Sequence, residues 1–354
     1  MLFSNVVSSS RLSSFICLIA LAACGGGPGT PTDPGRPTPV PGHPVSGFVY
    51  YDENGNGALD ASETVRLPNV TVSVGGRTGQ STAEGRFTVT DVPAGTQSAS
   101  PTPDSLPAYF TAEAAVSVAV PQAGGELAVP ATLPIAPNKP NVYMAFGDSI
   151  TAGDGAGPGE SYPDWLQADL RAYWGKALIL NQGVPGTKSN QGESRLLTLL
   201  ARYRPAYVLI LYGTNDWNEP QCRNPDLFPC FTIDALRSMI LQSRDFGAQP
   251  IVGTIPPVNP AYTDKNVEER NQWVVAMNGL LRTMAQQERV QVAEVHADFA
   301  AEPDLRALFA DEKHPSAEGY RVMARSWWNA ITGPLSVGGS SRPRRSFSFA
   351  PAGP

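Results

Sequence analysis

The stretch "MAFGDSITAG" (residues 144–153) decides how the second half of this chain is interpreted. It completes an apolar run, residues 142–146, and then places Gly147, Asp148 and Ser149 in succession. A serine at such a point either closes a turn or presents its hydroxyl at the carboxyl edge of a sheet, where α/β proteins carry their chemistry. The sequence on either side has to decide between these two interpretations.

The pattern of apolar and polar residues from Asn141 to Thr332 predicts an α/β fold. Continuous apolar runs alternate there with amphipathic helical segments, which indicates a parallel sheet covered by helices on both faces. We therefore expect a three-layer α/β/α domain over residues 137–335. The expected strands are 141–147, 177–183, 206–213, 249–256 and 290–296, and the expected helices are 162–174, 193–203, 233–246, 267–288 and 316–331.

A serine hydroxyl needs a base, because it is a poor nucleophile at neutral pH. The chain has 3 histidines, and His314 in "DEKHP" is the best candidate. Asp311 lies three residues earlier and can fold back to hold Nδ1 of the imidazole, leaving Nε2 for Ser149. Pro315 would then begin the last helix. A helix-entry turn with an incidental histidine is the alternative.

The other two histidines are weaker candidates. His43 lies in a segment rich in Pro and Gly. His296 follows the last expected strand, where Glu294 and Asp298 are expected on the same face, so these three side chains are a possible metal-ligand set. Alternating polar residues at a strand end are the other interpretation.

Acyl transfer also needs donors aimed at the oxygen that becomes negatively charged. The carboxyl ends of parallel strands meet at one edge, and three candidate donors follow three different strands: the N–H of Ser149, the N–H of Gly186 and the side-chain amide of Asn215. Each alone is compatible with turn chemistry, but together they form a consistent oxyanion site.

These motifs resemble those of the GDSL family of SGNH hydrolases: "FGDSITAG", "NQGVPGTKS", "LYGTNDW" and "DEKHPSAEGY". The resemblance covers the whole predicted α/β domain. It implies a flavodoxin-like sheet, Ser149 as nucleophile, Asp311 with His314 as its base, and Ser149, Gly186 and Asn215 as oxyanion donors. It implies cleavage of carboxylic esters, of short acyl or acetyl groups, through an acyl-serine without a catalytic cofactor. Acetylated polysaccharides and lipids are both within the family's range.

Two other functions stay open at this point. The chain could be a cell-surface adhesion or carbohydrate-binding protein whose α/β half serves for docking, or an acyl transferase on the same scaffold. Turnover of a simple ester separates the first of these from a hydrolase.

Residues 45–136 have a different pattern. Short runs in which apolar and polar residues alternate, separated by turn-forming residues, predict a small antiparallel β-sandwich. The expected strands are 45–51, 69–74, 85–92, 114–120 and 126–133. We expect this sandwich and the α/β domain each to bury a core of its own.

The segment "DENGNGALDASE" (residues 52–63) spaces oxygen ligands as a calcium loop does. The predicted ligands are Asp52, Asn54, Asn56, the carbonyl of Ala58, Asp60 and Glu63. A hairpin rich in Asn and Gly that binds no ion is the alternative. The flanking strands resemble the calcium-bearing B-type repeat domains of bacterial surface proteins and the wider prealbumin-like family, which implies structural Ca²⁺ and a spacer or binding role.

The ends of the chain and its cysteines indicate export. Residues 1–23 have the pattern of a secretory signal, and "LAAC" before a glycine run resembles a lipobox, with Cys24 as the lipidated residue. An ordinary signal peptide with a chance cysteine is the alternative. Residues 24–44 are expected to form a tether and residues 336–354 a tail. Together with the lipobox, these segments predict an exported bacterial lipoprotein, membrane-anchored in the periplasm or at the cell surface.

Two further expectations concern the mature protein. Cys222 and Cys230 share one loop with no other Cys or His near, so an oxidising compartment favours a disulfide between them. The net charge of the full chain is -6, and it becomes one unit more negative, -7, when Arg11 leaves with the signal, which argues against nucleic acid as a partner. We expect a monomer held to the membrane by its lipid anchor.

Overall fold

The computed structural model describes residues 41–112, 115–223, 230–263 and 266–336. The signal segment, Cys24, nearly all of the predicted tether and nearly all of the predicted tail lie outside these residues. The first strand begins at His43, so the last two residues of the predicted tether are part of it. Within the described ranges, no helix has the length and apolar character needed to cross a bilayer.

The first half of the described chain, called the β region below, forms two four-stranded sheets. One has the order β4 (Arg86–Val92), β1 (His43–Asp52), β8 (Leu127–Thr132), β6 (Thr111–Ala112). The other has the order β3 (Arg77–Gln80), β2 (Thr71–Val74), β5 (Gly95–Pro101), β7 (Val116–Val120). The expected all-antiparallel pairing is wrong at one place, because β1 and β8 run parallel. β3, β5 and β6 had no counterpart among the expected strands.

The burial pattern explains why these segments form strands. In β4, Phe87 and Val89 are buried while their neighbours Arg86 and Thr88 are exposed, which is the alternation of a strand with one face in a core. Apolar side chains from both sheets, such as Val89 and Val72, belong to one buried cluster.

The second half, called the α/β region, contains one parallel five-stranded sheet. The order is β10 (Leu178–Gly183), β9 (Lys139–Gly147), β11 (Pro205–Leu211), β12 (Gln249–Gly253), β13 (Gln291–Ala293). All four neighbouring pairs are parallel. The chain therefore starts in the second position, steps outward once, and then crosses to the other side, which is the flavodoxin-like order. Its reversal point lies between β9 and β11, where ligands of open α/β sheets bind.

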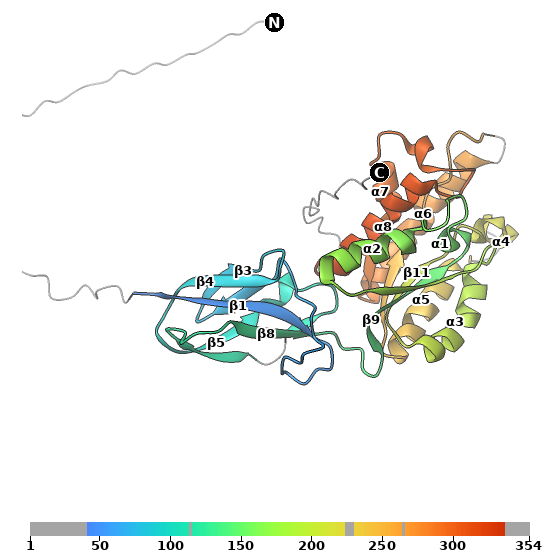
Figure 1. Ribbon diagram of the computed structural model, residues 1–354. Coiled ribbons are helices and arrows are strands. Elements are labelled where there is room, and N and C mark those ends of the chain that lie inside the picture. The colour runs from blue at the N-terminus through green and yellow to red at the C-terminus, as the bar shows by residue number, and fades with distance from the viewer. Residues whose placement is uncertain (1–40, 113–114, 224–229, 264–265, 337–354) are drawn as a thin grey trace, which may run out of the picture. The chain divides into compact units, whose positions relative to one another are not determined.

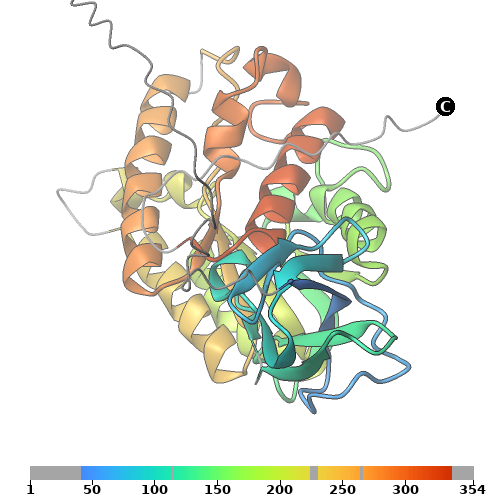
Figure 2. The ribbon, with the colours of Figure 1, turned by 90° about the vertical axis from the view of Figure 1, so that its left-hand side faces the viewer.

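Helices cover both faces of this sheet, so the three-layer prediction is confirmed (Figures 1 and 2). In β9, Tyr143 and Ala145 pack into one cluster and Met144 and Phe146 into another, as alternation along a strand requires. The first cluster includes α2 (Tyr162–Trp174), α7 (Val295–Ala300) and α8 (Ala317–Thr332). The second includes α3 (Ser189–Tyr203), α5 (Thr232–Asp245) and α6 (Val267–Gln287).

Local sequence sets the ends of the helices. Ser161 and Asp164 form a capping box at the start of α2, and Gly175 ends that helix with a left-handed backbone (φ 78°). The expectation that Pro315 begins the last helix is wrong by a short margin. Ser316 caps α8 instead, and its hydroxyl accepts a hydrogen bond from the N–H of Gly319.

The last strand is shorter than expected. β13 ends at Ala293 and α7 begins at Val295, so His296 lies on a helix. Val295 and Phe299 are both buried, and their spacing of four residues places them on one helical face, which favours a helix over a longer strand.

The two regions share a core, and the expectation of separate cores is wrong. Tyr207 of β11 donates a hydrogen bond to the carbonyl of Ala108 (2.9 Å). The hydroxyl of Tyr109 donates to the carbonyl of Pro250 (2.6 Å) and accepts from the N–H of Gln291 (2.8 Å). Aromatic rings therefore join the β region to the α/β sheet, and both belong to one compact unit.

Candidate active site

Ser149 stands at the junction of the first α/β strand and a single helical turn. β9 ends at Gly147, and α1 (Ser149–Ala152) begins two residues later. The side chain of Asp148 caps this turn by accepting a hydrogen bond from the N–H of Ile150 (2.9 Å). Gly147 is required there, because a Cβ would lie 2.5 Å from the carbonyl oxygen of Leu211. The predicted strand-end position of Ser149 is thus present.

His314 reaches Ser149 across a long sequence distance. Its Nε2 lies 2.9 Å from Oγ of Ser149, and its Nδ1 lies 2.7 Å from Oδ2 of Asp311. The other oxygen of Asp311 accepts hydrogen bonds from the N–H groups of His314 (2.8 Å) and Lys313 (2.9 Å). The turn that the sequence predicted therefore holds the imidazole by its Nδ1 and directs Nε2 at the serine.

Asp311 is held in its ionised form. Partial burial raises the pKa of its carboxyl group, but hydrogen bonds from the His314 ring and from two backbone N–H groups outweigh burial and leave the pKa below its ordinary range. An ionised carboxylate at Nδ1 favours the tautomer whose Nε2 carries no proton and stabilises the imidazolium formed when Nε2 takes one.

The three predicted oxyanion donors lie at the same edge. Asn215 follows β11, and its Nδ2 lies 3.0 Å from the carbonyl oxygen of Thr187 and 3.4 Å from Oδ2 of Asp148. Gly186 precedes Thr187 in the turn after β10 and has a positive φ of 76°, which glycine adopts without strain. The amide of Asn215 thus lies between the turn of Gly186 and the residue before Ser149.

Asp148 is a buried acid in the middle of this arrangement. Only 1% of its surface is exposed. Burial raises the pKa of Asp148 to about 7, with a further contribution from the charge of Asp216, against the opposing hydrogen bond from Ile150. Proton binding by Asp148 is thus coupled to folding near neutral pH.

Comparison with known proteins places this site in a family. Residues 145–322 match the GDSL-like Lipase/Acylhydrolase family, which is half of the 354 residues. The chain belongs to that family. The matched range contains Ser149, Gly186, Asn215, Asp311 and His314.

The individual proteins that this GDSL-like chain resembles are identical to it at 30% or fewer of the matched residues. It is 30% identical over 118 residues to the uncharacterized lipoprotein YqeF of Bacillus subtilis strain 168, covering 32% of this chain and 48% of YqeF. It is 26% identical over 112 residues to thioesterase 1/protease 1/lysophospholipase L1 of Escherichia coli K12, covering 32% of this chain and 50% of that enzyme. The matches therefore span about half the length of each relative.

Solved structures of similar proteins include Axe2, an acetylxylan esterase from Geobacillus stearothermophilus. The likeness has a TM-score of 0.45 at 20% identity and covers 56% of this chain and 96% of Axe2. The crystal structure of TesA gives a TM-score of 0.44 at 23% identity and covers 54% of this chain and 97% of TesA.

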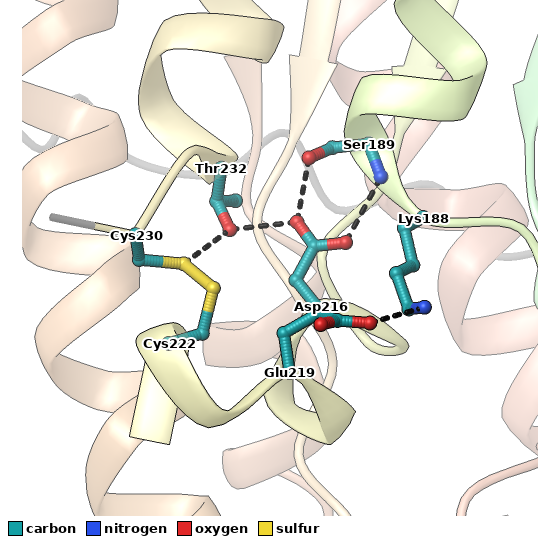
Figure 3. The surroundings of a disulfide bond; sticks show 7 residues. All are labelled: Lys188, Ser189, Asp216, Glu219, Cys222, Cys230 and Thr232. Carbon is teal, nitrogen blue, oxygen red and sulfur yellow. Dashed lines mark hydrogen bonds and ion pairs between the residues drawn. A yellow bond between two sulfur atoms is a disulfide. The ribbon is translucent and has the colours of Figure 1, made fainter. Parts of the chain in front are cut away.

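The predicted disulfide between Cys222 and Cys230 is present in this GDSL-like domain. It lies beside a buried polar cluster that the sequence did not indicate (Figure 3). Asp216 accepts hydrogen bonds from the backbone N–H and the hydroxyl of Ser189 (2.9 and 2.6 Å) and from the hydroxyl of Thr232 (2.6 Å). That same hydroxyl lies 3.1 Å from Sγ of Cys230. The cluster joins the starts of α3 and α5 directly behind Asn215.

Trp217, at the start of the disulfide loop, is an inward-packing residue. Its ring lies 5.9 Å from that of Trp273, and only 9% of its surface is exposed. Phe228, the other aromatic residue of that loop, lies outside the described residues. Trp217 therefore packs inward against α6.

The alternative metal set is not brought together. Glu294 forms an ion pair with Arg282 (2.6 Å), and Asp298 accepts a hydrogen bond from Ser326 (2.6 Å). Burial lowers the pKa of His296, and the positive charge of Arg282 lowers it further. Across the described residues, no cluster of three or more His, Cys, Asp or Glu side chains suited to a metal ion is found.

The acidic loop of the β region is organised around two buried carboxylates. Asp52 accepts hydrogen bonds from the N–H groups of Gly55 and Gly57 (2.8 and 2.7 Å). Glu63 accepts from the N–H groups of Glu53 and Asp60 (2.9 and 3.0 Å). Asp52 and Glu63 are only 0% and 2% exposed.

The remaining predicted calcium ligands surround these two. Asn54 and Asn56 both donate through Nδ2 to one oxygen of Asp60, at 2.7 and 2.9 Å. The oxygen of Asn56 accepts from the N–H of Ala58 (2.7 Å). Carboxylate and amide oxygens are the donors that Ca²⁺ prefers, and buried carboxylates suit a cation. The donor set therefore fits calcium in type, although within the described residues Asp52, Asp60 and Glu63 are not gathered as a group of metal ligands.

One residue close to the catalytic turn was missed by the sequence analysis. Nη2 of Arg195, from α3, donates to the carbonyls of Gly147 (3.0 Å) and Gln182 (2.7 Å) and to the hydroxyl of Tyr212 (2.7 Å). Its guanidinium also lies 4.2 Å from the centre of the Phe146 ring. An arginine in an amphipathic helix looks like a surface residue, so no pattern in the sequence indicated this contact.

Proposed function

We propose that this protein is a serine hydrolase that cleaves carboxylic esters through an acyl-serine intermediate. The observation that carries the proposal is the continuous chain of contacts from Asp311 through His314 to Ser149, at 2.7 and 2.9 Å. Membership of the GDSL-like Lipase/Acylhydrolase family supports the same chemistry. In this proposal Ser149 is the nucleophile, His314 the base, and Asp311 the group that orients and stabilises His314.

The reaction follows from this geometry. Nε2 of His314 takes the proton of Ser149 as Oγ attacks the ester carbonyl carbon, and the carbonyl oxygen becomes an oxyanion. The N–H groups of Ser149 and Gly186 and Nδ2 of Asn215 donate to that oxygen. When the bond to the alcohol breaks, the alcohol takes the proton from His314. Water then repeats the sequence on the acyl-serine, releasing the acid and restoring Ser149.

Short acyl groups, acetyl groups included, are the proposed substrates. The related Escherichia coli enzyme is named a thioesterase and a lysophospholipase, and both names describe cleavage of the bond between an acyl carbonyl carbon and its leaving sulfur or oxygen. Acyl groups on a polysaccharide or on a lipid present the same carbonyl to Ser149, so the proposal covers both.

A structural calcium ion in the β region is a second part of the proposal. Asp52, Asn54, Asn56, Asp60 and Glu63, with the carbonyl of Ala58, would hold it. When bound, the ion would offset the negative charges of Asp52, Asp60 and Glu63. Burial and the negative charges of Asp52, Glu63 and Asp60 raise the pKa of nearby Tyr50 to about 12, which supports a strongly acidic environment. The catalytic steps do not involve this ion.

We also propose that the protein is exported and anchored by lipid on Cys24, in the periplasm or at the cell surface. The lipobox-like "LAAC" and the relative named a lipoprotein support this. Cys24→Ala tests it: the variant should move from the membrane fraction to the soluble fraction of expressing cells. Retention of Cys24→Ala in washed membranes would exclude lipid at Cys24 as the anchor.

The catalytic proposal is tested by turnover. The protein should hydrolyse a short-chain p-nitrophenyl ester, and activity on acetylated xylan, acetylated peptidoglycan fragments and lysophospholipids should then identify the substrate class. Absence of turnover on every ester would favour the binding or adhesion function. Transfer of the acyl group to an added sugar, in preference to water, would favour an acyl transferase.

A further inference from the structure

A buried arginine on α6 connects the two loops that carry the proposed catalytic groups. Arg270 lies in the first turn of α6, and only 4% of its surface is exposed. Nη2 of Arg270 donates to the carbonyl of Thr214 (2.8 Å), and Nη1 lies 3.2 Å from Oε1 of Glu312. A single guanidinium thus reaches two loops that are far apart in the sequence.

The two contacts fall next to the proposed catalytic groups. Thr214 immediately precedes Asn215, the proposed oxyanion donor, and Glu312 immediately follows Asp311. One arm of the guanidinium therefore holds the oxyanion side of the site and the other holds the acid–base side. The planar guanidinium fixes the directions of both contacts at once, whereas a lysine ammonium on its flexible side chain does not.

Neighbouring residues strengthen this connection. Asn259 donates through its N–H to the carbonyl of Glu312 (2.8 Å) and through Nδ2 to the carbonyl of Asp311 (3.2 Å). Asn271, next to Arg270 on α6, holds both backbone groups of Val258 (2.9 and 3.1 Å). The start of α6 is thus linked by side-chain hydrogen bonds to the loop after β12 and, through it, to the loop of Asp311.

Burying a guanidinium at this point is costly. Burial lowers the pKa of Arg270, which shows that its environment disfavours the charge, while Glu312 and Asp148 oppose this shift. Apolar residues of similar volume often replace a buried ion pair without loss of stability. A charged fork at this point is instead suited to setting a geometry between two loops.

We propose that Arg270 is a positioning residue that fixes the separation between Asn215 and the Asp311–His314 pair. This inference rests on the proposed ester hydrolysis. It predicts that loss of Arg270 impairs the step in which the oxyanion forms, because a displacement of catalytic groups by about 1 Å can cost about 10²-fold in rate. Substrate binding depends less on this separation, so KM should change little.

The experiment measures kcat and KM on a p-nitrophenyl ester for Arg270→Gln and Arg270→Lys, with the melting temperature of each variant. Arg282→Gln is the control, because Arg282 also lies on α6 and pairs with a glutamate, but that glutamate is Glu294 and not a residue of the catalytic loops. Arg270→Gln should lower kcat by about 10²-fold with KM within about twofold of the wild type. Arg270→Lys should give an intermediate kcat, and Arg282→Gln should keep that of the wild type.

A double-mutant cycle separates positioning from general destabilisation. In the Asn215→Ala background, Arg270→Gln should lower kcat far less than in the wild type, because the donor that it positions is already absent. Equal effects in the two backgrounds, or a folded Arg270→Gln with the wild-type kcat, would overturn the inference. If Arg270→Gln does not fold, a wild-type kcat for Arg270→Lys would overturn it. Failure of the hydrolase proposal is distinguishable, since the wild type would then show no turnover that Ser149→Ala removes.

Discussion

The acidic loop of the β region and the catalytic edge of the α/β region are both built around buried carboxylates, yet they are assembled differently. In the acidic loop, Asp52 and Glu63 bond to partners no more than 10 residues away. At the catalytic edge, the contact between His314 and Ser149 joins residues 165 positions apart, and that between Asn215 and Asp148 joins residues 67 apart.

The difference shows which parts of the molecule the acidic loop and the catalytic edge each depend on. Asp52 and Glu63 are satisfied within the loop, so most of its geometry is set by a short stretch of sequence, although Glu53 also pairs with Lys176 (2.8 Å) of the α/β region. The catalytic edge exists only because parallel strands bring their carboxyl ends together and because α6, α8 and the intervening loops hold the ends in place. We therefore expect metal ions to act on the loop and single polar substitutions to act on the edge.

The largest expected effect belongs to the catalytic edge. Ser149→Ala should lower ester turnover on the order of 10⁶-fold, because the acyl acceptor is lost, and His314→Ala should be nearly as severe. The melting temperature of Ser149→Ala should stay close to that of the wild type. His296→Ala is the matched control, and its kcat should change little. A severe His296→Ala with a mild His314→Ala would reject His314 as the base.

The second-largest effect is expected from removal of the proposed oxyanion donor Asn215. Asn215→Ala should lower kcat by about 10² to 10³-fold with little change in KM, because a donor used in the transition state contributes little to substrate binding. Steady-state kinetics on a short-chain ester measures both constants. An unchanged kcat with a raised KM would make Asn215 an ordinary substrate contact.

The third effect belongs to the acidic loop. Excess Ca²⁺ should stabilise the protein by mass action, by about 2.7 kcal/mol at 100 times Kd, which corresponds to a rise in Tm of about 5 to 10 °C. EGTA and Asp52→Asn should each abolish the rise, whereas Asp91→Asn, an exposed change outside the loop, should preserve it. Ester turnover measured well below Tm should be the same with and without EGTA. A loss of turnover in EGTA that zinc restores would contradict a metal-free active site.

A fourth expected effect concerns the pH dependence of stability and not turnover. Burial raises the pKa of Asp148 to about 7, so the folded protein binds this proton more tightly than the unfolded chain does. The stabilisation is complete below the ordinary pKa of an aspartate and is lost as the pH rises towards 7. Asp148→Asn should remove this loss, so its Tm relative to that of the wild type should rise between about pH 4 and about pH 8. A Tm difference that does not change with pH would show that Asp148 titrates normally.

How much of this could be predicted from the sequence follows from the same comparison. Ser149, Gly186, Asn215 and the Asp311–His314 pair were indicated because each follows its own apolar strand, and the order of a parallel sheet then brings them together. The disulfide was indicated by the isolation of Cys222 and Cys230. The six proposed calcium ligands were predicted from their spacing within one short segment, and that assignment stays a prediction.

The missed features depend on tertiary contacts that leave no local pattern. Arg195 and Arg270 resemble surface residues of amphipathic helices until the loops that they hold are placed. The parallel pairing of β1 with β8 and the core shared through Tyr109 and Tyr207 require knowledge of which surfaces meet. The prediction that the last strand extends to His296 was wrong, because Val295 and Phe299 are both buried and their spacing of four residues favours a helix.

The most direct measurement of the central claim is covalent labelling of the nucleophile. A fluorophosphonate ester reacts only with an activated serine, since the attacking oxygen must lose its proton to a base. Peptide mass spectrometry should find one adduct per chain, on Ser149, with loss of ester turnover in parallel. His314→Ala should remain folded and unlabelled. Ester turnover that continues while Ser149 stays unmodified, or an adduct on another serine that abolishes turnover, would contradict the account.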